Sequence, residues 1–200
     1  MYFIGITGGV GAGKTQVLDY LKQKEGVRVM LADEIAHELM EPGTACYGNL
    51  KEAFAQYDVW DDNGLFNKEK LAKLLFSNDS FRQRLNAIVH PAVKEYVKEQ
   101  FALEKEKDRL RLLVLEAALL IEEHYDEICQ ELWYIHTEPD IRRARLKASR
   151  GYSDKKIDEI MESQLDPEVY RKYCKEVIDN GGSSEDTHKQ IDHALGRIRL

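Results

Sequence analysis

Short apolar runs alternate with helical patterns along the 200-residue chain. Between the runs, apolar residues recur at the three- and four-residue spacing of amphipathic helices. Strands that alternate with helices form parallel sheets covered on both faces, so the pattern predicts an α/β fold with three layers and a five-stranded, mainly parallel sheet. The five expected strands lie at residues 2–7, 27–31, 112–115, 132–136 and 176–178.

The segment between the second and third expected strands is far longer than a crossover requires. Its apolar residues indicate several helices, at Leu50, Phe54 and Tyr57, at Leu71, Leu74 and Leu75, and at Leu85, Ile88 and Val89. We therefore expect a single domain over residues 1–200, with a core of 1–32 and 111–200 and a helical insertion at 33–110. An insertion beside a strand end is well placed to hold a second substrate, although structural decoration is the alternative.

Residues 8–15 read GGVGAGKT and match the phosphate-binding pattern GxxxxGK(S/T). They follow an expected strand and precede an amphipathic stretch, which is the order that this motif requires and which a chance glycine-rich turn would lack. The glycines let successive N–H groups surround a phosphate chain, Lys14 adds a positive charge, and the hydroxyl of Thr15 suits Mg²⁺. The pattern predicts ATP and Mg²⁺ bound by Gly9, Gly11, Ala12, Gly13, Lys14, Thr15 and Gln16.

Composition narrows the possible partners. A net charge of −7 provides no general attraction for nucleic acid, and no apolar run approaches the ~20 residues of a membrane span. The opening of the chain resembles a strand and not a signal peptide, so we expect a cytosolic protein that acts on a small molecule. Cys46, Cys129 and Cys174 form no CxxC pair, which predicts buried free thiols. The sequence leaves the oligomeric state open.

Two carboxylates follow expected strands. Asp33 comes after the second strand, where it could accept a hydroxyl proton, orient that hydroxyl for in-line attack, or bind Mg²⁺. The alternative for Asp33 is a helix N-cap, and both roles are compatible. Glu116 ends the third strand, where it could help to hold Mg²⁺ and water or be an ordinary polar strand end.

A helix that begins near residues 137–140 is rich in arginine and is followed by Gly151 and by Ser153 as a cap. Guanidinium groups stabilise the charge that develops in phosphoryl transfer, so some of the arginines are expected to form a closing lid at about 140–165, while others are a solvated face. Spacing does not identify which of them act; the set is Arg142, Arg143, Arg145 and Arg150.

Three further signals concern helix ends. His90 precedes Pro91, which predicts an extended residue before a proline that opens the next helix. Residues 104–109 alternate in sign and indicate a solvated helix end. Residues 183–186 predict the cap of a last helix.

Several motifs together resemble the dephospho-coenzyme A kinase family over nearly the whole chain. They are IGITGGVGAGKT (4–15), ADEIA (32–36), EPG (41–43), DNGLFNK (62–68), LNAIVHP (85–91), ALLIE (118–122) and VIDNGG (177–182). The resemblance implies that ATP phosphorylates the ribose 3′-hydroxyl of dephospho-coenzyme A with Mg²⁺. It also implies that Asp33 is the base, that His90 and the insertion belong to the acceptor pocket, and that Asn180 lies near the adenine.

The resulting assignment has three parts. The expected catalytic residues are Asp33, Lys14, Arg143 and Arg145. Arg150, Asn180 and Gly181 join the loop at the nucleotide, and Thr15 and Asp33 are the metal ligands. The acceptor is expected at Asp33, His37, Lys68, His90 and Glu116.

The chain also departs from the family pattern. Leu31 replaces an aspartate, His37 and Lys68 replace arginines, and Ala118 replaces a proline. Arg145 and Arg150 are five residues apart, where the family's lid arginines are four apart. Because lysine supplies only a point charge and neutral histidine none, these departures alter anion recognition at the acceptor site.

Two alternative functions follow from the departures. One is a diverged kinase of the same fold that acts on another nucleoside or nucleotide. The other is a non-catalytic, nucleotide-binding regulator. The presence of Asp33 beside an intact loop favours a kinase, because a regulator needs no acceptor base.

Overall fold

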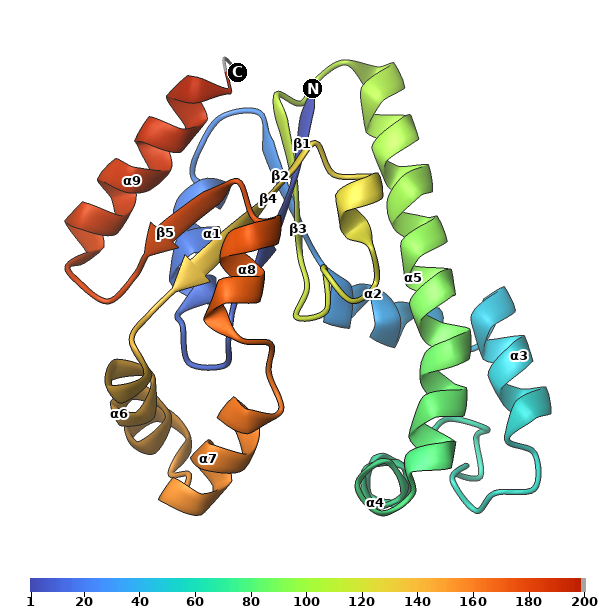
Figure 1. Cartoon of the computed structure of the whole chain (residues 1–200). Coiled ribbons are helices and arrows are strands. Elements are labelled where there is room, and N and C mark those ends of the chain that lie inside the picture. The colour runs from blue at the N-terminus through green and yellow to red at the C-terminus, as the bar shows by residue number, and fades with distance from the viewer. Residues whose placement is uncertain (199–200) are drawn as a thin grey trace. The chain divides into compact units, whose positions relative to one another are not determined.

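A parallel β-sheet forms the centre of the structure, a computed structural model that describes residues 1–198. The strands lie in the order β2-β3-β1-β4-β5, and every neighbouring pair is parallel (Figure 1). They span Tyr2–Thr7 (β1), Val27–Leu31 (β2), Leu112–Glu116 (β3), Glu131–His136 (β4) and Glu176–Asp179 (β5). All five predicted strands are therefore confirmed, and the sheet is wholly parallel.

Helices connect the strands. They span Lys14–Lys22 (α1), Ala32–Leu39 (α2), Ala45–Ala53 (α3), Lys68–Ser77 (α4), Asp79–Lys107 (α5), Pro139–Arg150 (α6), Asp154–Glu162 (α7), Pro167–Tyr173 (α8) and Ser184–Arg197 (α9), with a short 3₁₀ turn at Tyr125–Glu127. The two predicted serine caps are confirmed. Ser153 Oγ accepts from the Lys156 amide at 3.3 Å, and Ser183 Oγ accepts from the Asp186 amide at 3.1 Å.

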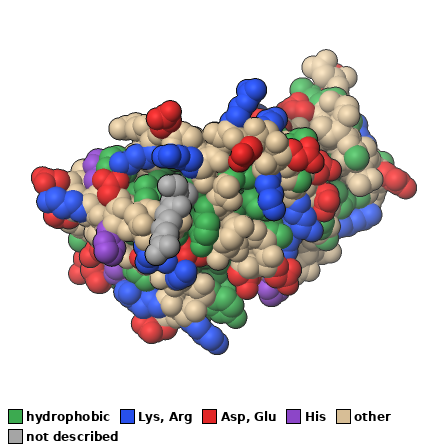
Figure 2. Space-filling model, turned by 90° about the horizontal axis from the view of Figure 1, so that it is seen from above, with side chains coloured by type: hydrophobic (Ala, Val, Ile, Leu, Met, Phe, Trp, Pro, Cys, Tyr) green, Lys and Arg blue, Asp and Glu red, His purple; other side chains and the backbone are tan. Residues whose placement is uncertain are grey.

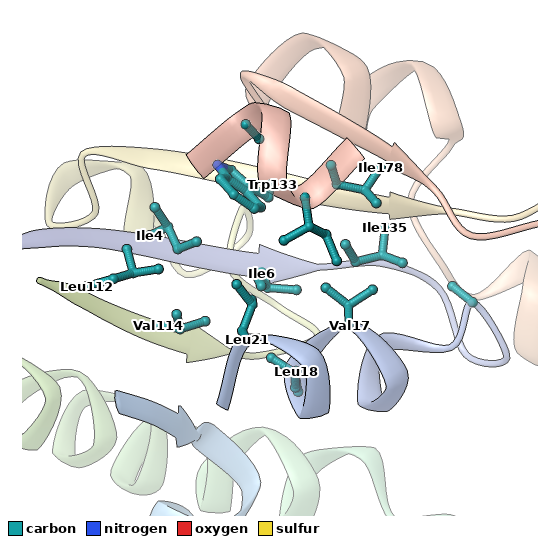
Figure 3. Packing of buried hydrophobic residues seen from close by; sticks show 13 residues of the cluster. Ile4, Ile6, Val17, Leu18, Leu21, Leu112, Val114, Trp133, Ile135 and Ile178 are labelled. Carbon is teal, nitrogen blue, oxygen red and sulfur yellow. The ribbon is translucent and has the colours of Figure 1, made fainter. Parts of the chain in front are cut away.

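Both faces of the sheet are covered, which confirms the three-layer fold. On one face, α1 and α9 pack against alternate residues of the strands and form a hydrophobic cluster with them, and Figure 3 shows Val17 and Leu21 of α1 directed toward the strands. On the other face, the ring of Phe3 stacks on that of Phe101 with centroids 5.0 Å apart. Tyr134 stacks in the same way on Tyr170 of α8, at 4.6 Å.

The chain forms two compact units, one of residues 1–31 with the chain from residue 101 onward, and one of residues 32–100. The first contains the sheet. The second contains α2, α3, α4 and most of α5, and it has its own aromatic cluster, in which the rings of Phe54 and Phe81 are 4.5 Å apart. The helical character predicted for this segment is confirmed.

The prediction for Pro91 was wrong. Helix α5 runs for 29 residues through Pro91, so His90 is helical and no new helix opens there. An internal proline costs a helix about 3 kcal/mol. That cost is offset because Leu85, Val89, Val93 and Val97, spaced four residues apart across the proline, are all buried. The apolar face of the helix outweighs the local signal of the proline.

The prediction of a solvated helix end at residues 104–109 was wrong for Glu104. This side chain is only 8% exposed. Its carboxylate accepts from Lys107 Nζ at 2.9 Å and from Arg28 Nη1 at 2.7 Å. The hydrogen bond from Lys107 and the charge of Arg28 hold the pKa of Glu104 below its ordinary value. Glu104 therefore links the end of α5 to strand β2 through its ion pair with Arg28.

Charged side chains of both signs are scattered over the face of the molecule drawn in Figure 2, without a large patch of either sign. Within residues 1–198, the structure contains no helix with both the length and the apolar character that crossing a membrane requires. All three cysteines are buried and unpaired, as predicted.

Candidate active site

The loop at residues 8–13 joins the central strand β1 to helix α1, which begins at Lys14 as expected. Gly11 and Gly13 have φ angles of 83° and 82°, a conformation that residues with a Cβ rarely adopt. Gly13 is the N-cap of α1 and provides no side chain there. The backbone therefore turns through left-handed conformations directly before a helix N-terminus, as anion binding requires.

Lys14 is held in place by the loop and by the end of strand β3. Its Nζ donates to the Gly8 carbonyl at 2.8 Å and lies 3.5 Å from Glu116 Oε1. Both side chains are 17% exposed. Glu116 stands in register with Ile6 of β1 and Leu31 of β2, at the carboxyl ends of all three strands. The structure thus brings together the predicted residues Lys14 and Glu116.

The next two residues of the motif lie in the first turn of α1, and both are exposed. Thr15 presents its hydroxyl on this turn. Gln16 Nε2 donates to Ser184 Oγ at 2.6 Å, which links the first turns of α1 and α9.

Asn180 directly follows β5 and forms hydrogen bonds with the loop. Its side chain is buried, and its Nδ2 donates to the carbonyl oxygens of Ala12 at 2.8 Å and Gly13 at 3.3 Å. Its Oδ1 accepts from Thr187 Oγ1 at 3.0 Å. The neighbouring Gly181 amide donates to Asp179 Oδ1 at 2.8 Å. Sequence reasoning placed Asn180 beside the nucleotide and missed its contact with the loop backbone.

The arginines of α6 divide into two groups. Arg142 and Arg145 contact the loop: Arg142 Nε donates to the Val10 carbonyl at 2.9 Å, and Arg145 Nη1 donates to the Ala12 carbonyl at 3.3 Å. Arg145 Nη2 also donates to the Asn180 carbonyl at 2.7 Å. Residues three apart share a helix face, and this spacing was the sequence signal that could have singled out Arg142.

Arg143 and Arg150 have other surroundings. Arg143 pairs with Asp154 and Asp158 of α7, at 3.0 and 2.5 Å. The hydrogen bonds that Arg143 donates to these carboxylates raise its pKa above the ordinary value. The Arg150 guanidinium lies 5.8 Å from the centre of the Tyr152 ring. The structure therefore brings Arg145 to the loop and holds Arg143 within an ion-pair cluster of α6 and α7.

The remaining predicted residues belong to the second unit. Asp33 and His37 are exposed on α2, Lys68 is the exposed first residue of α4, and His90 is half-buried on α5. Because α2 begins at Ala32, Asp33 stands in its first turn and the N-cap interpretation was wrong. Asp33 follows Leu31, the last residue of β2, by two residues.

The oxygen donors at the loop suit Mg²⁺ bound together with a nucleotide. Within the described part of the chain, no three His, Cys, Asp or Glu side chains are grouped to hold a metal by themselves. Mg²⁺ is usually held by one or two protein groups with substrate phosphates and water. Thr15, which is exposed in the first turn of α1, fits this kind of site as one protein ligand.

Comparisons with known proteins agree with this geometry. A family described as dephospho-CoA kinase matches residues 2–186. A dephospho-CoA kinase of Corynebacterium efficiens is 33% identical over 99% of this chain and 98% of its own length. One of Streptococcus mutans is 30% identical over 98% and 97%.

Solved structures share the fold. A crystal structure from Thermus thermophilus has a TM-score of 0.80 and 27% identity, and covers 100% of this chain and 98% of its own. A dephospho-CoA kinase from Campylobacter jejuni has a TM-score of 0.70 at 20% identity, and covers 98% and 96%. The chain therefore belongs to the dephospho-CoA kinase family and is a phosphate-transferring enzyme that uses ATP.

Proposed function

We propose that this chain uses ATP and Mg²⁺ to phosphorylate the ribose 3′-hydroxyl of dephospho-coenzyme A, which gives coenzyme A and ADP. The observation that carries this proposal is the arrangement of Lys14, which is fixed on a glycine-rich loop at the carboxyl ends of the central strands. The family match over residues 2–186 supports the choice of acceptor.

The donor nucleotide occupies the loop. Amides of residues 9–16 surround its phosphates, and Lys14 supplies a positive charge to them. Thr15 and Asp33 would hold Mg²⁺, which would neutralise charge on the phosphate oxygens. Asn180 and Gly181 lie beside the adenine, and the hydrogen bonds of Asn180 to Ala12 and Gly13 support this placement next to the loop.

Asp33 is the base of the reaction. As the ribose oxygen forms its bond to the γ-phosphorus, the proton of the hydroxyl passes to the Asp33 carboxylate and the bond to ADP breaks. The position of Asp33 two residues after β2 supports this role, because ligands of parallel sheets bind at the carboxyl ends of the strands.

Arginines of the lid stabilise the transferring group. Arg145 is supported by its contacts with Ala12 and Asn180, which leave its charge without a carboxylate partner among residues 1–198. Arg143 leaves its partners Asp154 and Asp158 and binds the transferring phosphate instead. Arg150 contacts the nucleotide from the end of α6. On the acceptor side, we assign His37, Lys68, His90 and Glu116 to the binding of dephospho-coenzyme A.

A cytosolic location is part of the proposal. Its support is the state of the three cysteines, which are buried and unpaired, as is usual in a reducing compartment.

A coupled assay tests the function. Purified protein with ATP and Mg²⁺ is expected to produce ADP when dephospho-coenzyme A is added, and the product is expected to carry a phosphate at the 3′ position. Adenosine and AMP serve as comparison acceptors because they lack the pantetheine arm. Failure to form ADP with dephospho-coenzyme A would refute the proposal, and a higher kcat/KM with another nucleoside would assign the chain a different acceptor.

A further inference from the structure

Arg142 lies against the phosphate loop, and within residues 1–198 its hydrogen-bond partners are neutral groups. Its Nε donates to the Val10 carbonyl at 2.9 Å, and its Nη2 donates to the side-chain oxygen of Gln164. The guanidinium also lies so close to Gly9 that a carbon added there would be 2.8 Å from Nη1. A positive charge is thus placed beside the residues that turn around the phosphates.

Among residues 1–198, no carboxylate pairs with Arg142, in contrast to its neighbour Arg143. Arg143 forms ion pairs with Asp154 and Asp158. Arg142 is half-buried, and burial lowers its pKa from the ordinary value. Arginine nevertheless stays protonated in proteins. A half-buried cation without a carboxylate gains stability when an anion approaches it, and the ligand of this loop is an anion.

The guanidinium also has N–H groups that the contacts with Val10 and Gln164 do not use. It carries five N–H groups, and the contacts with Val10 and Gln164 engage only two nitrogen atoms, Nε and Nη2. Gln164 follows α7 and presents a neutral oxygen, which orients the guanidinium without cancelling its charge. A carboxylate in the same place would orient it equally well and would compete with phosphate.

We propose that Arg142 binds a phosphate group of the donor nucleotide on the Gly9–Val10 side of the loop, and that Gln164 is a positioning residue that holds the guanidinium there. This inference rests on the proposed function in one respect, the binding of ATP at the loop. It adds to the lid a phosphate-binding arginine other than Arg143 and Arg145, and it gives the segment after α7 a role in nucleotide binding.

Titration calorimetry with ATP, without acceptor, tests both assignments. We expect Arg142→Gln and Gln164→Glu each to raise the Kd for ATP at least tenfold. Their Kd for adenosine, which lacks phosphate, should stay within twofold of that of the unchanged protein. Arg171→Gln is the matched control: it removes one positive charge from an exposed arginine of α8, and its Kd for ATP should also stay within twofold.

The Gln164→Glu variant separates positioning from a purely structural role. It preserves the hydrogen-bond acceptor, so its urea unfolding midpoint should match that of the unchanged protein while ATP binding weakens. ATP affinity equal to that of the unchanged protein in either variant would overturn the inference. A chain that binds ATP as described but does not phosphorylate dephospho-coenzyme A would overturn the proposed function and leave this inference standing.

Discussion

The contact between Gly9 and Arg142 predicts a large energetic coupling between these two residues. A carbon added at Gly9 would lie 2.5 Å from the central guanidinium carbon of Arg142, so the arginine must move in Gly9→Ala. Gly9 itself is not among the glycines with positive φ. Alanine therefore fits the backbone at this position, and the arginine alone makes the substitution unfavourable.

The magnitude follows from the bonds that are lost. Displacement of the guanidinium breaks its hydrogen bonds to Val10 and Gln164, each of which contributes about 1 kcal/mol. Alanine in place of glycine restores about 0.4–1 kcal/mol by restricting the unfolded chain. Gly9→Ala should thus lower the free energy of unfolding by about 1–2 kcal/mol. In an Arg142→Ala background it should instead raise this free energy by about 0.4–1 kcal/mol.

Urea unfolding of the four proteins of this double-mutant cycle measures the coupling, which should be about 2 kcal/mol. Gly11→Ala is the control. Because Gly11 has a φ of 83°, alanine there should destabilise by about 1–2 kcal/mol in both backgrounds. If Gly9→Ala has the same effect with and without Arg142, the guanidinium does not occupy the space beside Gly9 and the reasoning fails.

Three further predictions concern other parts of the chain. Asp33→Asn should lower kcat by about 10²–10⁴-fold, the usual contribution of a general base, while calorimetry in the absence of Mg²⁺ shows an unchanged Kd for ATP; a kcat within tenfold of the original would contradict the role of Asp33. Glu131 is buried and accepts from Trp133, Lys175 and Arg197. Burial alone would raise the pKa of Glu131, but these partners outweigh it and lower the pKa. The stability that Glu131 contributes is therefore present at pH values above 4.5, the ordinary pKa of a glutamate, and is lost as the pH falls below this value. In urea unfolding, Glu131→Gln should lower the free energy of unfolding by about 1–3 kcal/mol near neutral pH and by less in acid. An equal loss at both pH values would show that the negative charge of Glu131 does not stabilise the fold. Burial raises the pKa of Cys129 and Cys174 to about 12, so iodoacetamide at about pH 8 should label them only in denaturing urea, and labelling of the folded chain would show that these thiols are accessible.

Local pattern alone predicted much of the sheet and of the phosphate loop. The five strands are apolar runs bounded by polar residues, and the three central strands β1, β3 and β4 are buried along most of their length because their composition favours burial. The caps at Ser153 and Ser183 bond to amides three residues away, which sequence spacing specifies directly. The same holds for the order of strand, glycine-rich loop and helix around Lys14.

Where the predictions failed, packing in the folded chain decided the structure. Pro91 is a helix-opening residue by local rules, but burial of Val89 and Val93 on the same face keeps α5 continuous. Glu104 belongs to a run of alternating charge, yet Arg28, 76 residues away, holds it in the interior.

The arginines of α6 show the same division within the site. The sequence by itself determined that a cluster of positive charge follows β4 and that a phosphate loop follows β1. Only the tertiary structure decided which charges remain available: two aspartates of α7 neutralise Arg143, whereas Arg142 and Arg145 meet the neutral carbonyl oxygens of the loop. The reason is physical, because the free energy of a charge depends on the groups that packing places around it, and those groups come from every part of the chain.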